Sequence, residues 1–228
     1  MAYTSKLSVI IPVFNEQERI GRCIENVRQA CGCDSEIIVV DGNPEGTTIR
    51  EISDDTVTTM VSDPGRARQM NAGARAASGG VLLFLHADTL LPAGADRLIE
   101  EALGAPAASA GAFKLTFDRD TPVLRFIAFV ADLRTRIERV PYGDQAVFIR
   151  KDTFEALGGY PDIPLMEDVE FFRRIKKQRR EIVILKAEIK TSSRRYNCGP
   201  LRCAVRNTVL RILHLCGVSP SRLAKLYR

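Results

Sequence analysis

The amino-acid sequence predicts an α/β fold, in which a single domain is built on a mixed, mainly parallel sheet flanked by helices. Continuous apolar runs, typical of strands buried on both faces, alternate with segments of helical periodicity. The chain has 228 residues and 45% hydrophobic content, which suits one α/β core. Polar residues follow three of the apolar runs. Because ligands of parallel sheets bind beyond the carboxyl ends of the strands, we expect a site at that edge.

The first half of the chain alternates predicted strands with predicted helices. Leu7 to Phe14 is a β-branched apolar run, and apolar residues recur at helical spacing after it. We expect Asn15 to cap this helix, with Glu18 reaching back as in a capping box. The further elements predicted here are a strand at 36–41, a loop at 42–46, a weaker strand at 57–61, a helix at 65–78 and a buried strand at 81–85.

The second half is predicted to extend the same sheet and to end in helices. Its predicted elements are strands at 110–117 and 145–150, a helix at 123–140 between them, and a helix at 167–177. After Leu201, an apolar stripe from Val205 to Cys216 predicts an amphipathic helix with several arginines, and Ser219 begins a short basic helix. We therefore divide the chain into a domain at 1–199 and a basic helical tail at 200–228, packed on the domain or extending from it.

The charge balance favours an anionic partner. Lys and Arg number 33 against 28 Asp and Glu, which gives a net charge of +5. This excess suits an anionic small ligand, an anionic membrane surface or nucleic acid, and by itself does not choose among them. No nucleic-acid partner is expected. For the tail, packing of its apolar stripe on the domain is the simpler interpretation, and peripheral docking on an anionic leaflet is the alternative.

Cysteine usage and hydropathy indicate the compartment. The six cysteines include no C-x-x-C pair and the chain has only two histidines, so a zinc site is not expected and the thiols are interpreted as reduced. The N-terminal segment lacks a full signal-peptide core, and the apolar stretches fall short of the ~20 residues of a membrane span. We expect a cytoplasmic protein, free or peripheral on the inner membrane face.

Motifs narrow the class of ligand. The chain has neither G-x-G-x-x-G after its first strand nor G-x-x-x-x-G-K-[ST], which disfavours dinucleotide and P-loop enzymes. It carries instead, in this order, S-V-I-I-P-V-F-N-E, V-V-D-G, F-L-H-A-D-T, G-D-Q-A-V-F-I-R-K-D and M-E-D-V-E-F-F-R-R-I. This series closely resembles the family 2 glycosyltransferases of the GT-A (Rossmann-like) fold. The segments T-S-S-R-R-Y and G-V-S-P-S-R-L-A-K-L-Y resemble the subgroup called radical-SAM/selenodomain-associated transferases.

The resemblance implies an inverting transferase that moves a sugar from a nucleotide-sugar donor, by default UDP-linked, to an acceptor hydroxyl. Asp41 would accept the imide hydrogen of uracil, because a carboxylate is an acceptor-only group. Guanidinium groups and free amides at a helix start suit a nucleotide or its diphosphate. The substrate-binding residues implied in this way are Pro12, Asn15, Glu16, Asp41, Arg66, Gln69, Asn71, His86, Gly143, Asp144, Gln145, Arg194 and Arg195.

A divalent cation, Mg²⁺ or Mn²⁺, is the cofactor that the resemblance implies. Asp88 matches the final acid of the family's D-x-D motif, which holds the metal against the diphosphate by oxygen ligation. This chain departs from the motif, because His86 stands where the first acid is expected. The metal would then rest on one carboxylate, phosphate oxygens and water. His86 is either a further ligand or a buried histidine at the sheet edge.

The pair Glu167-Asp168 corresponds to the acids from which the family draws its catalytic base. Neighbouring residues on a helix project about 100° apart, so both carboxylates cannot face one acceptor hydroxyl. By the family pattern we assign Asp168 as the base and Glu167 as its support. The expected position at a helix N-terminus favours the ionised form. The plainer interpretation is two acids that balance the helix dipole.

Two rival functions stay open at this stage. A sugar-phosphate nucleotidyltransferase would need a glycine-rich basic loop after the first strand, and Phe14-Asn15-Glu16 does not supply one. A non-catalytic nucleotide-binding or scaffold protein could keep the same pocket, and the histidine at position 86 raises that alternative. Slow hydrolysis of the donor would separate an enzyme from a binding module. The acceptor, which is lipid-linked if the tail docks on a membrane, and the oligomeric state are not predicted.

Overall fold

A computed structural model of the chain describes residues 6–32, 34–197 and 199–227, and in these residues eight strands form one sheet in the order β3-β2-β1-β4-β7-β6-β8-β5. Strands β3, β2, β1 and β4 run parallel, β7 is antiparallel to β4 and β6, and β8 is parallel to β6. The strands are β1 Leu7–Val13, β2 Glu36–Asp41, β3 Thr58–Val61, β4 Val81–Phe84, β5 Thr89–Leu90, β6 Ala108–Phe117, β7 Val147–Arg150 and β8 Glu181–Thr191. The predicted mixed, mainly parallel α/β sheet is confirmed.

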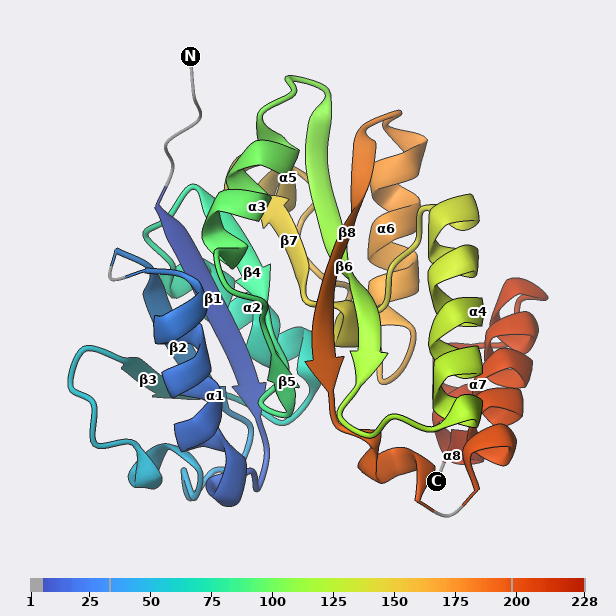
Figure 1. Cartoon of the computed structure of the whole chain (residues 1–228), viewed down its shortest axis with the longest axis horizontal. Helices are drawn as coiled ribbons and strands as arrows, with labels where there is room; N and C mark the ends of the chain where they lie inside the picture. The colour runs from blue at the N-terminus through green and yellow to red at the C-terminus, as the bar shows by residue number, and fades with distance from the viewer. Residues whose placement is uncertain (1–5, 33, 198, 228) are drawn as a thin grey trace.

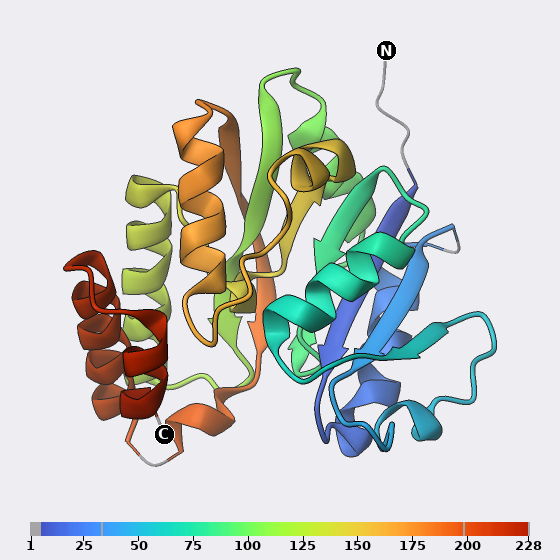
Figure 2. The ribbon, with the colours of Figure 1, turned by 180° about the vertical axis from the view of Figure 1, so that it is seen from behind.

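Helices cover both faces of the sheet, and further helices lie at one end of the molecule (Figures 1 and 2). α1 and α3 lie on one face, and α2, α5 and α6 lie on the other. The α-helices are α1 Gln17–Ala30, α2 Arg66–Ala76, α3 Ala95–Leu103, α4 Pro122–Glu138, α5 Lys151–Ala156, α6 Glu167–Lys177, α7 Pro200–Leu215 and α8 Pro220–Tyr227. Short 3-10 turns occur at η1 Ile49–Glu51, η2 Gly143–Gln145 and η3 Ser193–Tyr196.

The alternation of side chains along each strand divides the core between these two faces. On β1, Val9 and Ile11 pack with α1, whereas Ile10 packs with α2. All three side chains are fully buried. This burial on both faces explains why β1, β2 and β4 are continuous apolar runs, the pattern from which they were predicted.

The capping box predicted for the first helix is not formed. Glu16 occupies the N-cap position of α1 and makes no side-chain capping bond. Asn15 adopts a left-handed backbone conformation with φ of 56°, a region that asparagine tolerates better than most residues. Its side-chain oxygen accepts hydrogen bonds from Asn43 Nδ2 at 2.9 Å and Thr47 Oγ1 at 3.2 Å. Asn15 therefore joins the loop after β2 instead of the helix.

Most of the apolar stripe predicted for α7 is exposed, although Leu213 is half-buried and the helix itself packs against α4 and η3. Val205, Val209 and Ile212 are 55%, 47% and 50% exposed. The helix buries a different side, on which Leu210 lies in the interior and His214 Nε2 contacts Glu170 Oε1 at 2.8 Å. Within the described residues, no helix is long and apolar enough to cross a bilayer.

Candidate active site

Predicted site residues gather at the edge where the carboxyl ends of β1, β2 and β4 meet. Glu16 follows β1, Asp41 ends β2, and Asp88 follows β4. A cavity of about 860 Å³ lies at the opposite edge, between Lys6, Glu36 and Val81 at the starts of these strands. Glu36 is already engaged there by the hydroxyls of Ser8 and Ser78. We place the site at the carboxyl edge, where ligands of parallel sheets bind.

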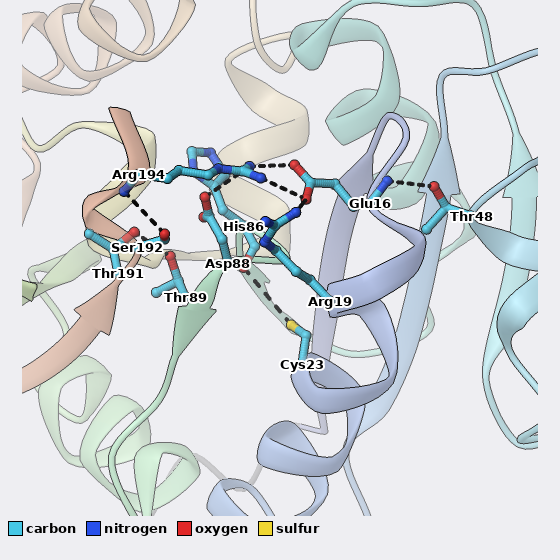
Figure 3. A network of polar contacts seen from close by, with 10 residues as sticks. All are labelled: Glu16, Arg19, Cys23, Thr48, His86, Asp88, Thr89, Thr191, Ser192 and Arg194. Atoms are coloured by element: carbon cyan, nitrogen blue, oxygen red, sulfur yellow. Dashed lines mark hydrogen bonds and ion pairs between the residues drawn. The ribbon is translucent and has the colours of Figure 1, made fainter. Parts of the chain in front are cut away.

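A single arginine joins two acidic side chains at this edge (Figure 3). Arg194 donates to both carboxylate oxygens of Glu16, with Nη1 3.1 Å from Oε2, and its Nη2 lies 3.0 Å from Asp88 Oδ2. Arg19 also pairs with Glu16 at 3.0 Å. Burial acts to raise the pKa of Glu16, but the hydrogen bonds and charges of Arg194 and Arg19 outweigh it and lower that pKa. Glu16 is therefore held ionised.

The sheet brings Arg194 to this position from the far end of the chain. Thr89 Oγ1 and Thr191 Oγ1 lie 3.0 Å apart where β5 pairs with β8, and Ser192 N donates to Asp88 O at 3.0 Å. The Ser192 hydroxyl then accepts from Arg194 N and starts η3. Pairing of β5 with β8 thus places the Arg194 guanidinium beside Asp88. The sequence alone does not indicate this contact, because the two residues are far apart along the chain.

Asp41 is buried under the loop that follows β2. Its side chain is 0% exposed, Oδ1 accepts from Asn43 N at 2.9 Å, and Oδ2 accepts from Thr48 N at 2.8 Å and Ile49 N at 3.4 Å. Thr48 Oγ1 accepts in turn from Glu16 N at 3.1 Å. The carboxylate thus organises the loop, and an interaction with a base stays a prediction that requires this loop to open.

We expect the substitution Asp41→Asn to destabilise the protein by about 1–3 kcal/mol. An asparagine amide has one oxygen where the carboxylate has two, so at least one buried backbone N–H loses its acceptor. Urea denaturation followed by circular dichroism measures the change. Asp34→Asn, at an exposed position, is the matched control. A midpoint equal to that of the control would contradict the role of Asp41 in the loop.

Three amide side chains that were predicted to contact the ligand make hydrogen bonds to other groups of the protein. Gln69 Nε2 donates to Val13 O at 2.6 Å and Val40 O at 2.9 Å, which ties α2 to β1 and β2. Asn71 makes two hydrogen bonds to the backbone of Tyr160. Gln145 Oε1 accepts from Thr135 and from the backbone of Tyr142. Because these amides already have their partners, we leave Gln69, Asn71 and Gln145 out of the proposed ligand site.

A second group of acids lines a pocket of about 120 Å³ between η2 and the start of α6. Asp168 Oδ2 accepts from Gly143 N at 2.9 Å, and Oδ1 accepts from Val169 N at 2.7 Å. A Cβ placed on Gly143 would lie 3.3 Å from His86 Nε2 and 3.9 Å from Asp168 Oδ2. Glycine therefore allows the imidazole and the carboxylate to approach the same backbone. The pocket is also lined by Asp144, Glu167, Arg66 and Arg195.

Burial shifts the pKa values of the acids and of the histidine in this pocket. It raises the pKa of Glu167 to about 7, and the adjacent carboxylate of Asp168 adds to that effect. Burial also raises the pKa of Asp168 against the two backbone hydrogen bonds, and burial with the charge of Asp168 raises the pKa of Asp144. For His86, burial and three nearby arginines lower the pKa well below its ordinary value. The imidazole is therefore neutral, and it lies among carboxyl groups whose pKa values are raised.

Several residues at this pocket were not predicted from the sequence, among them Tyr142, Asn207 and Tyr227, which line it. The guanidinium of Arg134, outside the pocket, lies 3.6 Å from the centre of the Tyr142 ring. Arg134 lies near the C-terminal end of α4, and nothing in its spacing along the helix distinguishes it from a solvated arginine. Tyr142 directly precedes the G-D-Q motif, and that position was the only available signal.

The residues around Asp88 supply only some of the ligands that a divalent cation needs. In the described part of the chain, no group of three or more His, Cys, Asp or Glu side chains is arranged to hold a metal ion. Asp88 offers a carboxylate, and the low pKa of His86 leaves its imidazole in the form that ligates metals. This donor set fits a cation whose remaining ligands come from a bound diphosphate and water. Arg194 would have to leave Asp88 Oδ2 first.

Comparisons with known proteins identify the family of the chain and the proteins that share its fold. The model of the family called Glycosyl transferase family 2 matches residues 8–155. An uncharacterized glycosyltransferase of Haemophilus influenzae is 31% identical over 85 residues, which cover 36% of this chain and 29% of that protein. The chain thus spans less than a third of the length of this curated relative.

Two solved structures share the fold at low sequence identity. The mannosyltransferase PcManGT from Pyrobaculum calidifontis, in complex with GDP-Man and Mn²⁺, superposes with a TM-score of 0.70 at 18% identity, over 96% of this chain and 67% of that one. Residues 1–349 of TarS from S. aureus, in complex with UDP-GlcNAc, give a TM-score of 0.61 at 17% identity, over 82% of this chain and 58% of that one. The similarity extends over both halves of the sheet.

Proposed function

Since this chain belongs to glycosyl transferase family 2, we propose that it transfers a sugar from a nucleotide-sugar donor to an acceptor hydroxyl. The observation that carries the proposal is the pocket in which Asp168 is held by two backbone N–H groups beside Arg66 and Arg195. It combines a proton acceptor with cations suited to a diphosphate. The neighbouring structures are complexes of GDP-Man and of UDP-GlcNAc, so either base is compatible with this fold.

The proposed reaction is an in-line displacement with inversion at the anomeric carbon. The acceptor oxygen forms a bond to that carbon while the bond from carbon to the diphosphate oxygen breaks, and Asp168 takes the hydroxyl proton. Arg66 and Arg195, together with Arg194 once it is released, neutralise the departing diphosphate. Glu167 and Asp144 tune the charge around Asp168. A divalent cation bound at Asp88 with the donor would stabilise the same leaving group.

Arg194 and a cation compete for one carboxylate in this scheme. We expect Arg194→Gln to strengthen binding of Mn²⁺ in the absence of donor by several-fold to about tenfold, because Asp88 then loses a paired cation. Titration with Mn²⁺ followed by electron paramagnetic resonance measures free ion directly. Arg195→Gln is the control, because it removes the same charge from the neighbouring position. Equal Mn²⁺ affinities of the two variants would contradict the competition.

A screen of nucleotide sugars tests the proposed function. A donor that binds only the folded chain raises its melting temperature, so we expect stabilisation by a UDP- or GDP-sugar and more of it with Mn²⁺. The stabilising donor is then incubated with the protein and hydrolysis is followed. Release of the nucleoside diphosphate supports an enzyme, whereas binding without any turnover supports the nucleotide-binding scaffold. Failure of every nucleotide sugar to stabilise the chain would overturn the proposal.

A further inference from the structure

Large apolar side chains are exposed mainly on two helices, α4 and α7. Among the described residues, such side chains number six on α4 and five on α7, against three elsewhere. They are Val123, Phe126, Phe129, Val130, Leu133 and Ile137 on α4, and Leu201, Val205, Val209, Ile212 and Leu215 on α7. Contiguous exposure of this kind marks an interaction surface, whereas single exposed apolar residues need no explanation.

The two sets belong to one surface, here called the α4–α7 face. On each helix the exposed residues recur at spacings of three and four, so they form a stripe opposite the buried residues Leu124 and Ala128 of α4 and Leu210 of α7. The helices lie side by side at one end of the molecule (Figures 1 and 2). The stripes therefore lie along the same outer side of the domain.

A cavity of about 170 Å³ lies between these helices and continues toward the catalytic pocket. Phe126 and Val130 of α4 and Leu201 of α7 line it while being at least 45% exposed, so it opens on the α4–α7 face. At its inner end it shares Tyr142 and Asp144 with the pocket around Asp168. Its walls thus change from apolar at the surface to polar at the site.

One unsatisfied polar atom marks the inner end of this cavity. Arg134 lines the cavity, and its Nη1 is buried without a hydrogen-bond partner among the described residues. A buried guanidinium nitrogen without an acceptor costs free energy, so it favours a ligand that brings an oxygen. The cavity therefore suits a molecule with an apolar body and a polar or anionic head.

The charge beside the face selects among possible occupants. Residues 199–228 contain no Asp or Glu, while Arg202, Arg206, Arg222 and Lys225 are exposed there. Two copies of the chain docked through this face would bring these cations together and would close the cavity mouth between α4 and α7. An anionic lipid leaflet accepts both the apolar stripes and the cations.

We propose that the α4–α7 face docks on an anionic lipid leaflet and receives acceptors carried by that leaflet through the cavity between α4 and α7. The stripes enter the interfacial region, and the exposed cations Arg202, Arg206, Arg222 and Lys225 contact the lipid headgroups. The polar head of the acceptor passes Arg134 and reaches Asp168 from the leaflet side, while its chain stays among the apolar walls. The evidence for docking is the α4–α7 face itself. The delivery of an acceptor rests in addition on the proposed glycosyl transfer.

Co-sedimentation with vesicles, without donor or acceptor, tests the docking. We expect the full chain to pellet with vesicles of phosphatidylglycerol and phosphatidylcholine, to pellet much less with phosphatidylcholine alone, and to be released by salt. Phe129→Ser/Leu133→Ser should weaken partitioning by about tenfold or more, because two large exposed side chains are lost. Val209→Ser should weaken it several-fold. Val61→Ser, whose side chain is 45% exposed on β3, is the matched control and should change nothing.

Negative outcomes overturn the proposal without touching the proposed transfer reaction. Absence of pelleting with both kinds of vesicle would overturn it, as would equal losses in the Val209 and Val61 variants. A dimer in sedimentation velocity that dissociates in Phe129→Ser/Leu133→Ser, with no vesicle binding, would assign the face to a second copy instead. Donor binding by thermal shift is measured on the same samples, so a failure of docking and a failure of the proposed function are seen separately.

Discussion

Replacing Asp168 by asparagine is expected to lower the rate of sugar transfer by about 10²–10⁴ while donor binding persists. The amide keeps the shape of the side chain and can still accept one backbone N–H, but it cannot take the proton of the acceptor hydroxyl. The change acts on the transition state, so kcat falls and the affinity for donor is retained. Single-turnover transfer gives the rate, and calorimetric titration with the donor gives the affinity.

The control for this variant is Asp152→Asn. Asp152 also lies in the first turn of a helix and accepts a hydrogen bond from the next backbone N–H, but it lies on α5 and is exposed. The Asp152→Asn variant therefore also removes a negative charge from a helix N-terminus, but at a position away from the pocket. If Asp168→Asn retains more than about a tenth of the wild-type rate, Asp168 is not the base. Loss of donor binding in this variant would instead assign Asp168 to the binding of the donor.

Replacing Glu167 by glutamine is expected to stabilise the protein at pH 8 by up to an order of 3 kcal/mol and to have little effect near pH 4. The pKa of Glu167 is raised from 4.5 to about 7 in the folded chain, mainly by burial. Below pH 4.5 the carboxyl is protonated in both states. As pH rises from 4.5 to 7 the unfolded chain ionises first, so wild-type stability is lost over this window, and glutamine does not take part in that loss.

Urea denaturation of wild type and Glu167→Gln at pH 4, 6 and 8 measures the difference in unfolding free energy. Glu155→Gln, at an exposed position on α5, is the control and should show no comparable gain. A difference that is the same at all three pH values would mean that ionisation of Glu167 carries no cost. The expected gain in stability also explains why an acid at this position indicates a function: a purely structural site would favour the amide.

The elements that were predicted well are those in which local pattern and burial agree. α6 begins and ends at the predicted residues because Val169, Phe172 and Ile175 form one apolar face and acids occupy its first turn. β8 and α3 were not predicted, although β8 alternates between buried and exposed residues over part of its length. Its charged residues hide a strand that pairs with β6 on one side and β5 on the other.

The candidate site was predicted as a set of residues, but its contacts were not. The sequence pointed to Glu16, Asp41 and Asp88 at the carboxyl edge because the strand ends that precede them are visible as apolar runs. The roles assigned to these residues and to Asp168 stay predictions. The partners of Gln69, Asn71 and Asp41 are backbone groups, and a backbone group has no signature in the sequence. The direction of the α7 stripe depends on which side of the helix meets the domain, and amphipathicity alone leaves that choice open when a helix has two apolar sides.

The ion pair between Glu16 and Arg194 also constrains the order in which the protein can mature. The two residues are 178 positions apart, so the contact cannot form until the chain up to Arg194 has left the ribosome. The strands β1, β2 and β4 can pair earlier, since they belong to the first half of the chain. A nascent chain would then hold Glu16 and Asp88 without Arg194, and Glu16 would keep only Arg19 as its cation. The contacts of Glu16 and Asp88 at this edge are thereby completed only after β8 has been made, and a chain truncated before Arg194 lacks them.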